Sequence, residues 1–267
     1  MFRDMNVYLL RQLVLRNIQL RFRGNVFGWL WSFLLPLLML GVYTFVFGNF
    51  FKSRWGIDLG ENKMVFALAL FSGLTLFNCF SESVTASVSC ITGNINYVKK
   101  VRFPLECLPL SNVLSAFLFA LPWIVLIFIT GGIVFGKVNL SWLLLPFALL
   151  PLMLFTAGVS LFTASLGVFF RDLQYLVTAL LQMLFFLSPI FYRLKNLPDG
   201  FQSMLMWNPL VWFIEVCRTL FFHGVLPDYT TLPTLTEWIV IYAFGITAFI
   251  LGAFWFLKTK RGFSDVL

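Results

Sequence analysis

The stretch of this chain that comes nearest to a phosphate-binding motif is GGIVFGKV, from Gly131 to Val138. It matches G-x-x-x-x-G-K, the spacing with which a glycine-rich loop surrounds nucleotide phosphates. Its eighth position is Val138, where that motif needs a Ser or Thr hydroxyl for magnesium, and it ends an apolar run instead of joining a strand to a helix. We therefore expect no nucleotide, magnesium or other cofactor in this chain, and any ATP chemistry to come from a partner.

Residue types for acid–base or nucleophilic catalysis are few and scattered. The chain has one histidine, His223, in an aromatic stretch where it is predicted to pack, and it contains no HExxH or GxSxG pattern. Glu82 stands out, because a charge at the centre of a membrane helix costs about 2.5–3.5 kcal/mol. Glu82 is therefore either a functional residue of a transport pathway or the mark of a helix's cytoplasmic end. The four cysteines form no CxxC pair, so we expect no metal site.

The composition indicates that these residues are carried by membrane helices. Hydrophobic residues make up 60% of the chain and charged residues only 11%, against roughly 25% in soluble domains, and the mean hydropathy is +0.90. Lys and Arg outnumber Asp and Glu by 19 to 11, but most of these cations flank apolar runs instead of gathering on a solvated face. The chain is thus expected to be an integral membrane protein that binds no nucleic acid.

Six stretches are long and apolar enough to span a bilayer, which takes about 20 residues each. The expected fold is an all-α polytopic membrane protein with spans near residues 26–51, 64–81, 108–134, 142–167, 173–192 and 238–257. With both termini in the cytoplasm, 12 of the 19 Lys and Arg residues fall on the inner side, as the positive-inside rule favours.

The N-terminal segment, residues 1–25, carries polar side chains on one predicted helix face. Gln12, Arg16, Gln19 and Arg23 follow one another at i, i+4, i+7 and i+11. Such a helix is expected to lie flat on the cytoplasmic membrane surface, where anionic lipid attracts each basic residue by about 1 kcal/mol. The alternative is an extension of the first span that supplies only topology charges.

The longest connection, residues 196–237, contains an apolar run that is broken at Asn208–Pro209. Because each half is too short to span, we expect two short re-entrant or interfacial helices on the outer face. The competing interpretation is eight spans, with a hairpin turning at this break on the inner face. Glu215 and Arg218 lie at i, i+3 and could face one another on a helix.

Aromatic residues make up 19% of the chain. Most tryptophans fall near predicted helix ends, which is typical of an aromatic belt at the membrane surface. Some rings could instead line a pathway, since an aromatic face stacks on the apolar face of a sugar ring. The candidate pathway or gate residues are Glu82, Trp207, Asn208, Pro209 and Trp212.

The most polar short segment is NYVKKVRFPLECLPL, residues 96–110. Pro104 disfavours a helical Phe103 and so separates a short helix from the next span. An exposed Phe103 beside Pro104, surrounded by charges, has the composition of a protein-docking surface, whereas a loop that only fixes topology would need just the cations. The predicted docking residues are Tyr97, Lys99, Lys100, Arg102, Phe103, Pro104 and Glu106.

Five segments in register resemble one known family. They are LRFRGNVFGWLWSFLLPLLMLGVYTFVFG (20–48), NINYVKKVRFPLECLPL (94–110), FFRDLQYLV (169–177), SPIFY (188–192) and NPL (208–210). Together they resemble the membrane-spanning subunit of ABC-2 type exporters, in the branch that exports lipid-linked polysaccharides such as O-antigen, capsule and teichoic acid. The resemblance covers essentially the whole chain.

This resemblance implies a permease of the bacterial inner membrane that is not itself an enzyme. It implies a homodimer joined to two cytoplasmic ABC ATPases that bind ATP and magnesium. One domain, 1–267, would comprise an interface helix (1–25), helices 1–5 (26–192) with a cytoplasmic coupling loop (89–107), an outer gate region (196–237) and helix 6 (238–257).

The implied substrate is a glycan on a polyprenyl pyrophosphate carrier within the membrane lipid. Arg16, Arg21 and Arg23 are then expected to attract the pyrophosphate, because a guanidinium matches phosphate oxygens with a planar fork of donors. The alternatives are an ABC-2 exporter of another cargo, such as a drug or small lipid, and an integral-membrane glycosyltransferase of the same pathway.

Overall fold

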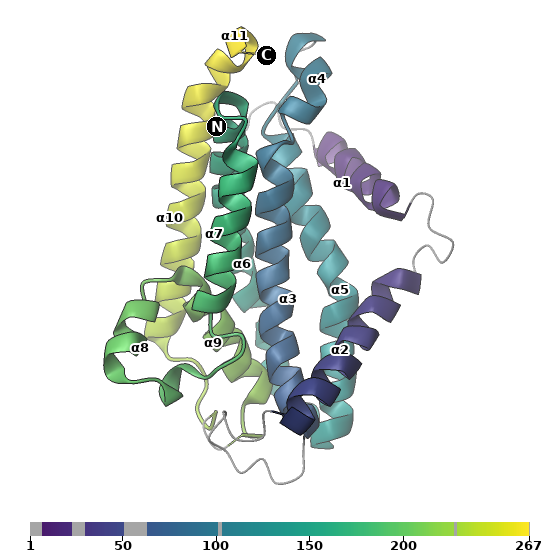
Figure 1. Ribbon diagram of the computed structural model, residues 1–267, viewed down its shortest axis with the longest axis vertical. Coiled ribbons are helices and arrows are strands. Elements are labelled where there is room, and N and C mark those ends of the chain that lie inside the picture. The colour runs from purple at the N-terminus through teal and green to yellow at the C-terminus, as the bar shows by residue number, and fades with distance from the viewer. Residues whose placement is uncertain (1–6, 23–29, 51–62, 101–102, 227–228, 267) are drawn as a thin grey trace.

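The structure, a computed structural model, describes residues 7–22, 30–50, 63–100, 103–226 and 229–266, and every regular element in these ranges is helical. The chain forms an elongated bundle of helices (Figure 1). Four segments are long and apolar enough to cross a membrane: Met64–Val88, Cys107–Phe135, Leu140–Phe169 and Leu235–Gly262. They correspond to α3 (Lys63–Val88), α5 (Cys107–Phe135), the short 3-10 turn η3 (Leu140–Leu144) with α6 (Leu145–Phe169), and α10 (Leu235–Thr259) continued by the 3-10 turn η5 (Lys260–Gly262). The all-α prediction is confirmed.

Two further helices of the bundle are shorter in their apolar part. α2 runs from Trp31 to Phe50, and α7 runs from Leu173 to Leu187. The predicted end of α7 at residue 192 is wrong by five residues. Its helix stops because Pro189 disfavours a helical residue before it, and Ser188 is extended with ψ of 144°. At 1.5 Å per residue α7 is only about 22 Å long, less than the roughly 30 Å hydrocarbon core.

α3 lies at the centre of the bundle, where it contacts α2, α5, α6, α7 and α9. Its residues Ala67 to Phe71 are completely buried. It continues to Val88, seven residues beyond the predicted end at Ser81. The polar Ser83 and Ser87 are accommodated in this buried turn because their hydroxyls donate to carbonyls of their own helix at 2.6 and 2.7 Å. Glu82 therefore lies within the helix and not at its end.

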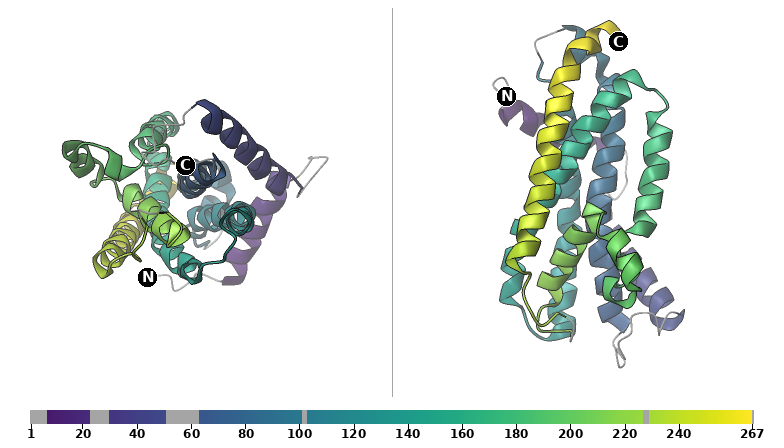
Figure 2. Two further views of the ribbon diagram at one scale, coloured as in Figure 1. Left: turned by 90° about the horizontal axis from the view of Figure 1, so that it is seen from below. Right: turned by 90° about the vertical axis from the view of Figure 1, so that its left-hand side faces the viewer.

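α6 and α10 pack backbone to backbone along their length (Figure 2). A Cβ atom on Gly158 would overlap the Ala248 carbonyl, and one on Gly252 would overlap the carbonyl of Gly158. One on Gly245 would come within 2.5 Å of the Pro151 oxygen. Small residues that allow such close approach are a general device for joining membrane helices.

The remaining elements gather at the two ends of the bundle. Toward one end lie α1, α4 and α11, and toward the other lie α8 and α9 (Figure 1). α1 runs in a different direction from α2 and is a separate helix. Their bounds, with those of the short 3-10 turns, are α1 Val7–Phe22, η2 Thr92–Asn94, α4 Ile95–Lys100, η4 Leu194–Asn196, α8 Asp199–Leu205, α9 Pro209–Phe222 and α11 Phe263–Val266.

The GGIVFGKV stretch is the end of a helix. α5 stops at Phe135, and Gly136 follows in the left-handed conformation with φ of 65°. Lys137 then extends to donate to the Gly224 carbonyl at 2.9 Å. Gly131 packs so closely on α9 that an added Cβ would come within 2.8 Å of the Phe221 ring. These residues end α5 and pack it against α9, and they do not form a loop between a strand and a helix.

The break at Asn208–Pro209 separates two short helices, as the sequence predicts. The Asn208 side chain accepts a hydrogen bond of 3.0 Å from the Leu210 amide, and Pro209 occupies the first position of α9, where its missing N–H costs nothing. α8 has 7 residues and α9 has 14, so each is shorter than a membrane span.

Candidate functional site

A cavity of about 450 Å³ lies between α1, α3 and α5. Its volume falls in the range of about 300–1,000 Å³ that is usual for small-molecule sites. The wall combines one cation from α1, a polar face of α3 and two aromatic rings from α5. These residues are Arg21; Thr75, Asn78, Ser81, Glu82 and Thr85; and Phe119 and Trp123.

The polar face of α3 consists of Asn78, Ser81, Glu82 and Thr85. Their spacing of i, i+3, i+4 and i+7 places all four on one side of the helix. Asn78 and Glu82 are exposed and the two hydroxyl residues are half-buried, although α3 is otherwise the most buried span. Polar side chains within a membrane span normally face a protein interior or a water-filled path, so this face of α3 is a candidate for either environment.

Arg21 lies at the edge of this cavity. It forms an ion pair with Glu82, and the exposed fractions of the two side chains are 46% and 43%. The guanidinium also lies over the Phe119 ring, 4.1 Å from its centroid, which is a cation–π geometry. A half-exposed ion pair contributes at most about 1 kcal/mol, so this contact orients both side chains without fixing them.

Hydrogen bonds from Asn17 position α1 against the cavity. Its amide nitrogen donates to Ser111 Oγ at 3.3 Å and to Asn112 Oδ1 at 3.0 Å, both on α5. Asn112 in turn donates to the Ala86 carbonyl of α3 at 3.1 Å. Because Asn17 lies one helical turn before Arg21, this network fixes the part of α1 that carries the cavity arginine.

The segment that the sequence predicts to dock a partner is tied to the same helix. Arg16 donates to the Tyr97 hydroxyl of α4 at 3.2 Å. The Tyr97 ring stacks on Phe103 with centroids 4.5 Å apart. Phe103 and Pro104 are non-helical between α4 and α5, as predicted. The expectation of an exposed Phe103 is wrong, however, because this stacking leaves it half-buried.

The last predicted docking residue, Glu106, is buried and paired within the chain. Its carboxylate accepts a hydrogen bond from Lys260 Nζ at 2.7 Å and is 6% exposed. Next to this pair Phe263 is completely buried, with its ring 5.6 Å from that of Phe256 and 5.9 Å from that of Phe169. The C-terminal segment therefore supports the base of the predicted docking segment.

A second cavity of about 500 Å³ lies between α3 and α7. Ser81 and Thr85 line this cavity as well as the first one. From α7, Thr178 and Gln182 add a second polar edge at i, i+4, and aromatic rings complete the wall. The rings are Phe77, Phe185 and Phe186.

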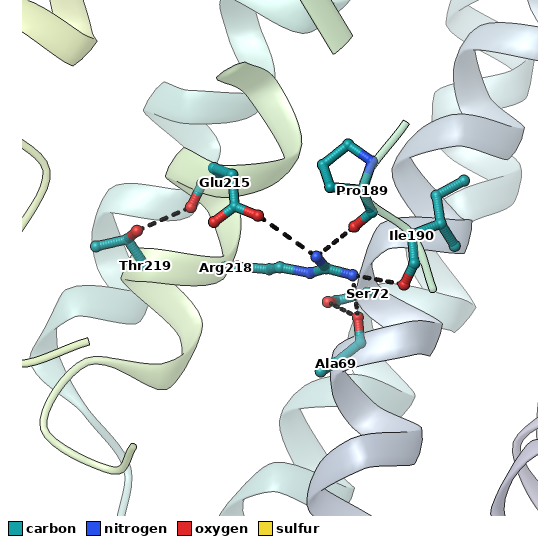
Figure 3. A network of polar contacts seen from close by, with 7 residues as sticks. All are labelled: Ala69, Ser72, Pro189, Ile190, Glu215, Arg218 and Thr219. Carbon is teal, nitrogen blue, oxygen red and sulfur yellow. Dashed lines mark hydrogen bonds and ion pairs between the residues drawn. The ribbon is translucent and has the colours of Figure 1, made fainter. Parts of the chain in front are cut away.

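A buried arginine connects α9 to the central helix α3 (Figure 3). Arg218 of α9 is completely buried, and its guanidinium donates to the Pro189 carbonyl, to the Ile190 carbonyl at 2.8 Å and to the Ala69 carbonyl of α3 at 3.1 Å. The predicted pairing with Glu215 is confirmed, at 3.5 Å. One side chain thus joins α3, the segment after α7, and α9.

A second buried arginine, Arg193, follows α7 and is 4% exposed. Its guanidinium lies 5.3 Å from the centroid of the Tyr229 ring. Burial, together with the nearby Glu215 carboxylate, raises the pKa of the Tyr229 phenol to about 12, although Arg218 and Arg193 oppose the shift. The phenol therefore remains neutral at physiological pH.

The predicted gate residues of α8 and α9 lie apart from both cavities. Trp207 is 86% exposed, and Trp212 donates to the Met206 carbonyl at 2.9 Å. Asn208 and Pro209 begin α9, as described above. Within the described residues none of these four lines a cavity with Arg21 or Glu82.

The structure brings together residues that the sequence assigned to different groups. Arg21 meets Glu82, and Arg16 meets Tyr97 instead of lining the cavity. Arg23 and Arg102 lie outside the described residues, and so do the side chains of Lys99 and Lys100, whose backbone ends α4.

Sequence reasoning missed most of the cavity wall. The periodic run of Asn78, Ser81, Glu82 and Thr85 in NCFSESVTAS was a usable signal, because it repeats at helical spacing inside an apolar segment. The partnership of Lys260 with Glu106 had no local signal, since 154 positions separate the two residues.

Comparison with known proteins places this architecture in a family. Residues 8–222 match the family described as ABC-2 type transporter. The chain is 31% identical over 256 residues to an O-antigen export system permease protein RfbA of Klebsiella pneumoniae, covering 94% of this chain and 92% of the relative. It is 33% identical over 234 residues to the RfbA of Myxococcus xanthus, covering 85% of each chain.

A third relative is the polysialic acid transport protein KpsM of Escherichia coli. It is 29% identical over 241 residues, which cover 87% of this chain and 88% of the relative. The helical bundle, its four apolar spans and the match over most of the chain agree with one another. This chain is a membrane protein that belongs to the ABC-2 type transporter family.

Proposed function

We propose that this chain is the permease subunit of an ATP-driven exporter that moves a lipid-linked polysaccharide across the bacterial inner membrane. The proposal rests on membership of the ABC-2 family and on the relatives, which are named for O-antigen export and polysialic acid transport. The chain acts as a homodimer with two ABC ATPase subunits, which bind ATP and magnesium. It forms a single domain, 1–267.

One observation carries the choice of cargo. In a bundle that is otherwise apolar, Ser81 and Thr85 border two cavities whose other walls combine hydroxyl and amide groups with aromatic rings. Carbohydrates are recognised by this combination, because their hydroxyls exchange hydrogen bonds with polar side chains and their ring faces stack on aromatic ones. A glycan crossing beside α3 would meet both kinds of contact in turn.

The membrane topology that we propose has six spans with both termini in the cytoplasm. α2 and α7 cross the bilayer together with the four longer helices, and α8 and α9 enter it from the outer side as gate helices. This arrangement places α1 and α4 on the cytoplasmic side, at the end of the bundle opposite α8 and α9 (Figure 1). A second copy of the chain would close the pathway along the exposed polar edge of α3 and α7.

The carrier's pyrophosphate would meet Arg21 at the edge of the first cavity, where the Arg21 side chain is 46% exposed. A guanidinium presents donors in a fork that suits two phosphate oxygens at once. Arg16 instead joins α1 to Tyr97 of α4. We propose that α4 and the residues up to Phe103 contact the ATPase, while Glu106 supports this segment from within the chain.

The test of this function is transport by the complete complex. The permease and its ATPase are reconstituted in vesicles with a polyprenyl pyrophosphate oligosaccharide, and ATP-dependent appearance of the glycan on the far side is measured by lectin binding. Replacing Ser81 with Ala and Thr85 with Val should slow transport roughly thirtyfold, since two hydrogen bonds of about 1 kcal/mol each are lost.

The matched control replaces Ser160 with Ala and Thr163 with Val. These hydroxyl residues are buried in α6, where Thr163 donates to the Val159 carbonyl at 3.0 Å, and they line neither cavity. The control should transport at nearly the wild-type rate. Equal rates for both double variants would contradict a glycan path beside α3. Movement of an amphiphilic drug in place of the glycan would favour the alternative cargo.

A further inference from the structure

The arginine that faces the first cavity already has an anionic partner inside the protein. Arg21 of α1 is ion-paired with Glu82 of α3, and both side chains line the cavity wall. A carboxylate and a phosphate group offer the same pair of acceptor oxygens to a guanidinium. Glu82 therefore occupies the position in which a phosphate ligand would bind.

The Arg21–Glu82 ion pair can open so that Arg21 exchanges Glu82 for another anion. With exposed fractions of 46% and 43%, both side chains remain in contact with solvent, and an ion pair of this kind is weak. The Phe119 ring, 4.1 Å from the guanidinium carbon, supports the arginine from its face, so the donors at its edge can change partners while this contact persists.

We propose that Glu82 is an internal competitor for the phosphate-binding site at Arg21. In the unliganded protein the carboxylate holds the arginine at the cavity, and a phosphate or pyrophosphate ester binds by displacing it. After displacement the free carboxylate repels the bound anion, which keeps binding weak enough for the ligand to leave. This inference rests on the proposed function, because it assumes that Arg21 meets the carrier's phosphates.

The Arg21–Glu82 pair is also linked through α1 to the predicted docking segment. Arg16 lies five residues before Arg21 on α1, about 7.5 Å along the helix axis, and donates to Tyr97 of α4. The Glu82 pair joins the C-terminal part of α1 to α3, and the Tyr97 contact joins its middle to α4. Opening the Arg21–Glu82 pair therefore releases one of the contacts that hold α1, the helix that α4 contacts through Tyr97.

The experiment compares ligand binding by four forms of the full-length permease in complex with its ATPase: wild type, Glu82→Gln, Arg21→Gln and the double variant. The complexes are placed in phosphatidylcholine nanodiscs, undecaprenyl pyrophosphate is titrated, and the bound lipid is counted by native mass spectrometry. Asp199→Asn serves as the matched control, because it removes an exposed carboxylate on α8 far from the cavity.

Glu82→Gln should tighten binding about threefold to fivefold, because the amide keeps the size of the side chain but neither forms an ion pair with Arg21 nor repels the anion. Arg21→Gln should weaken binding. In that background Glu82→Gln should tighten binding less than it does in the wild type, because only the repulsion is left to remove. Asp199→Asn should match the wild type. Basal ATP hydrolysis should respond to lower lipid concentrations in Glu82→Gln than in the wild type.

Two results would overturn the competitor role: weaker binding in Glu82→Gln, which would make the glutamate part of the binding site, or an equal gain from Glu82→Gln when Arg21 is absent. Unchanged binding in Arg21→Gln would instead remove the proposed headgroup site itself. Inorganic pyrophosphate distinguishes the source of the phosphate. If it binds to the site more tightly than the undecaprenyl ester, a lipid-linked ligand is excluded.

Discussion

Replacing Arg218 with Met should destabilise the protein more than any other single change to α8 or α9. The guanidinium is completely buried, donates to three backbone carbonyls on two separate segments, and lies 3.5 Å from the Glu215 carboxylate (Figure 3). Methionine fills a similar volume but donates no hydrogen bond. The substitution would therefore leave Glu215 and the carbonyls of Pro189, Ile190 and Ala69 without this donor.

The expected cost is about 3–5 kcal/mol in the free energy of unfolding. Removing one member of a buried ion pair costs about that much. We expect the lower end of this range, because the Glu215 side chain is 25% exposed and Arg193 and Lys195 also act on its carboxylate. For a chain of this size, a change of 1 kcal/mol shifts the midpoint of thermal unfolding by about 2–4 °C, so the midpoint should fall by roughly 10 °C. Adding Glu215→Gln to Arg218→Met should recover part of the lost stability, since an uncharged amide then replaces the carboxylate that has lost Arg218.

The shift is measured by heating the purified protein in detergent and quantifying the remaining folded fraction by size-exclusion chromatography. Gly73→Ala should act in the same direction but more weakly, because its Cβ would lie 3.0 Å from a terminal guanidinium nitrogen of Arg218. Gly132→Ala is the matched control, since open space surrounds that position. A midpoint for Arg218→Met within 2 °C of the wild type, by the same roughly 2–4 °C per kcal/mol scale, would refute the reasoning.

Three further predictions concern the end of the bundle that carries α1, α4 and α11, and the packing of α6 against α10. Lys260→Met leaves the buried Glu106 carboxylate without this partner and should lower the free energy of unfolding by about 1–3 kcal/mol. It should also reduce the amount of ATPase that co-purifies on an affinity column, and undiminished recovery would argue that the pair does not support ATPase docking. Tyr97→Phe removes only the hydroxyl that contacts α1 while keeping the ring, so stability should change by less than about 1 kcal/mol but ATP-dependent transport should slow; equal transport would show that this link is not used. Gly252→Ala places a Cβ on the Gly158 carbonyl and should lower the free energy of unfolding by about 1–3 kcal/mol. Thermal unfolding measures this loss against the Gly132→Ala control, and an equal midpoint for the two variants would contradict it.

Most of the fold was predictable because it follows from local patterns. Apolar length revealed the long spans, and the Asn–Pro pair at 208–209 marked the boundary between α8 and α9. The errors occurred where local polarity misled. α3 continues beyond Ser81, with the hydroxyls of Ser83 and Ser87 hydrogen-bonded to their own helix, and α7 ends before Pro189 although the sequence stays apolar.

The candidate site was only partly predictable, because it depends on contacts between distant segments. Composition singled out Arg21 and Glu82 separately, but nothing local indicates that residues 61 positions apart form an ion pair. The aromatic wall contributed by Phe119 and Trp123 was hidden among 34 Phe and 9 Trp residues. Helix packing decides which rings face the cavity, and packing is a property of the whole bundle.

The position of α11 has a practical consequence for measuring assembly. This helix contacts α4, and Phe263 anchors it in the bundle. A fluorophore attached at the exposed Ser264 would therefore sit beside the region that we expect the motor subunit to cover. Its emission would report arrival and departure of that subunit in real time, without any label on the nucleotide or the cargo.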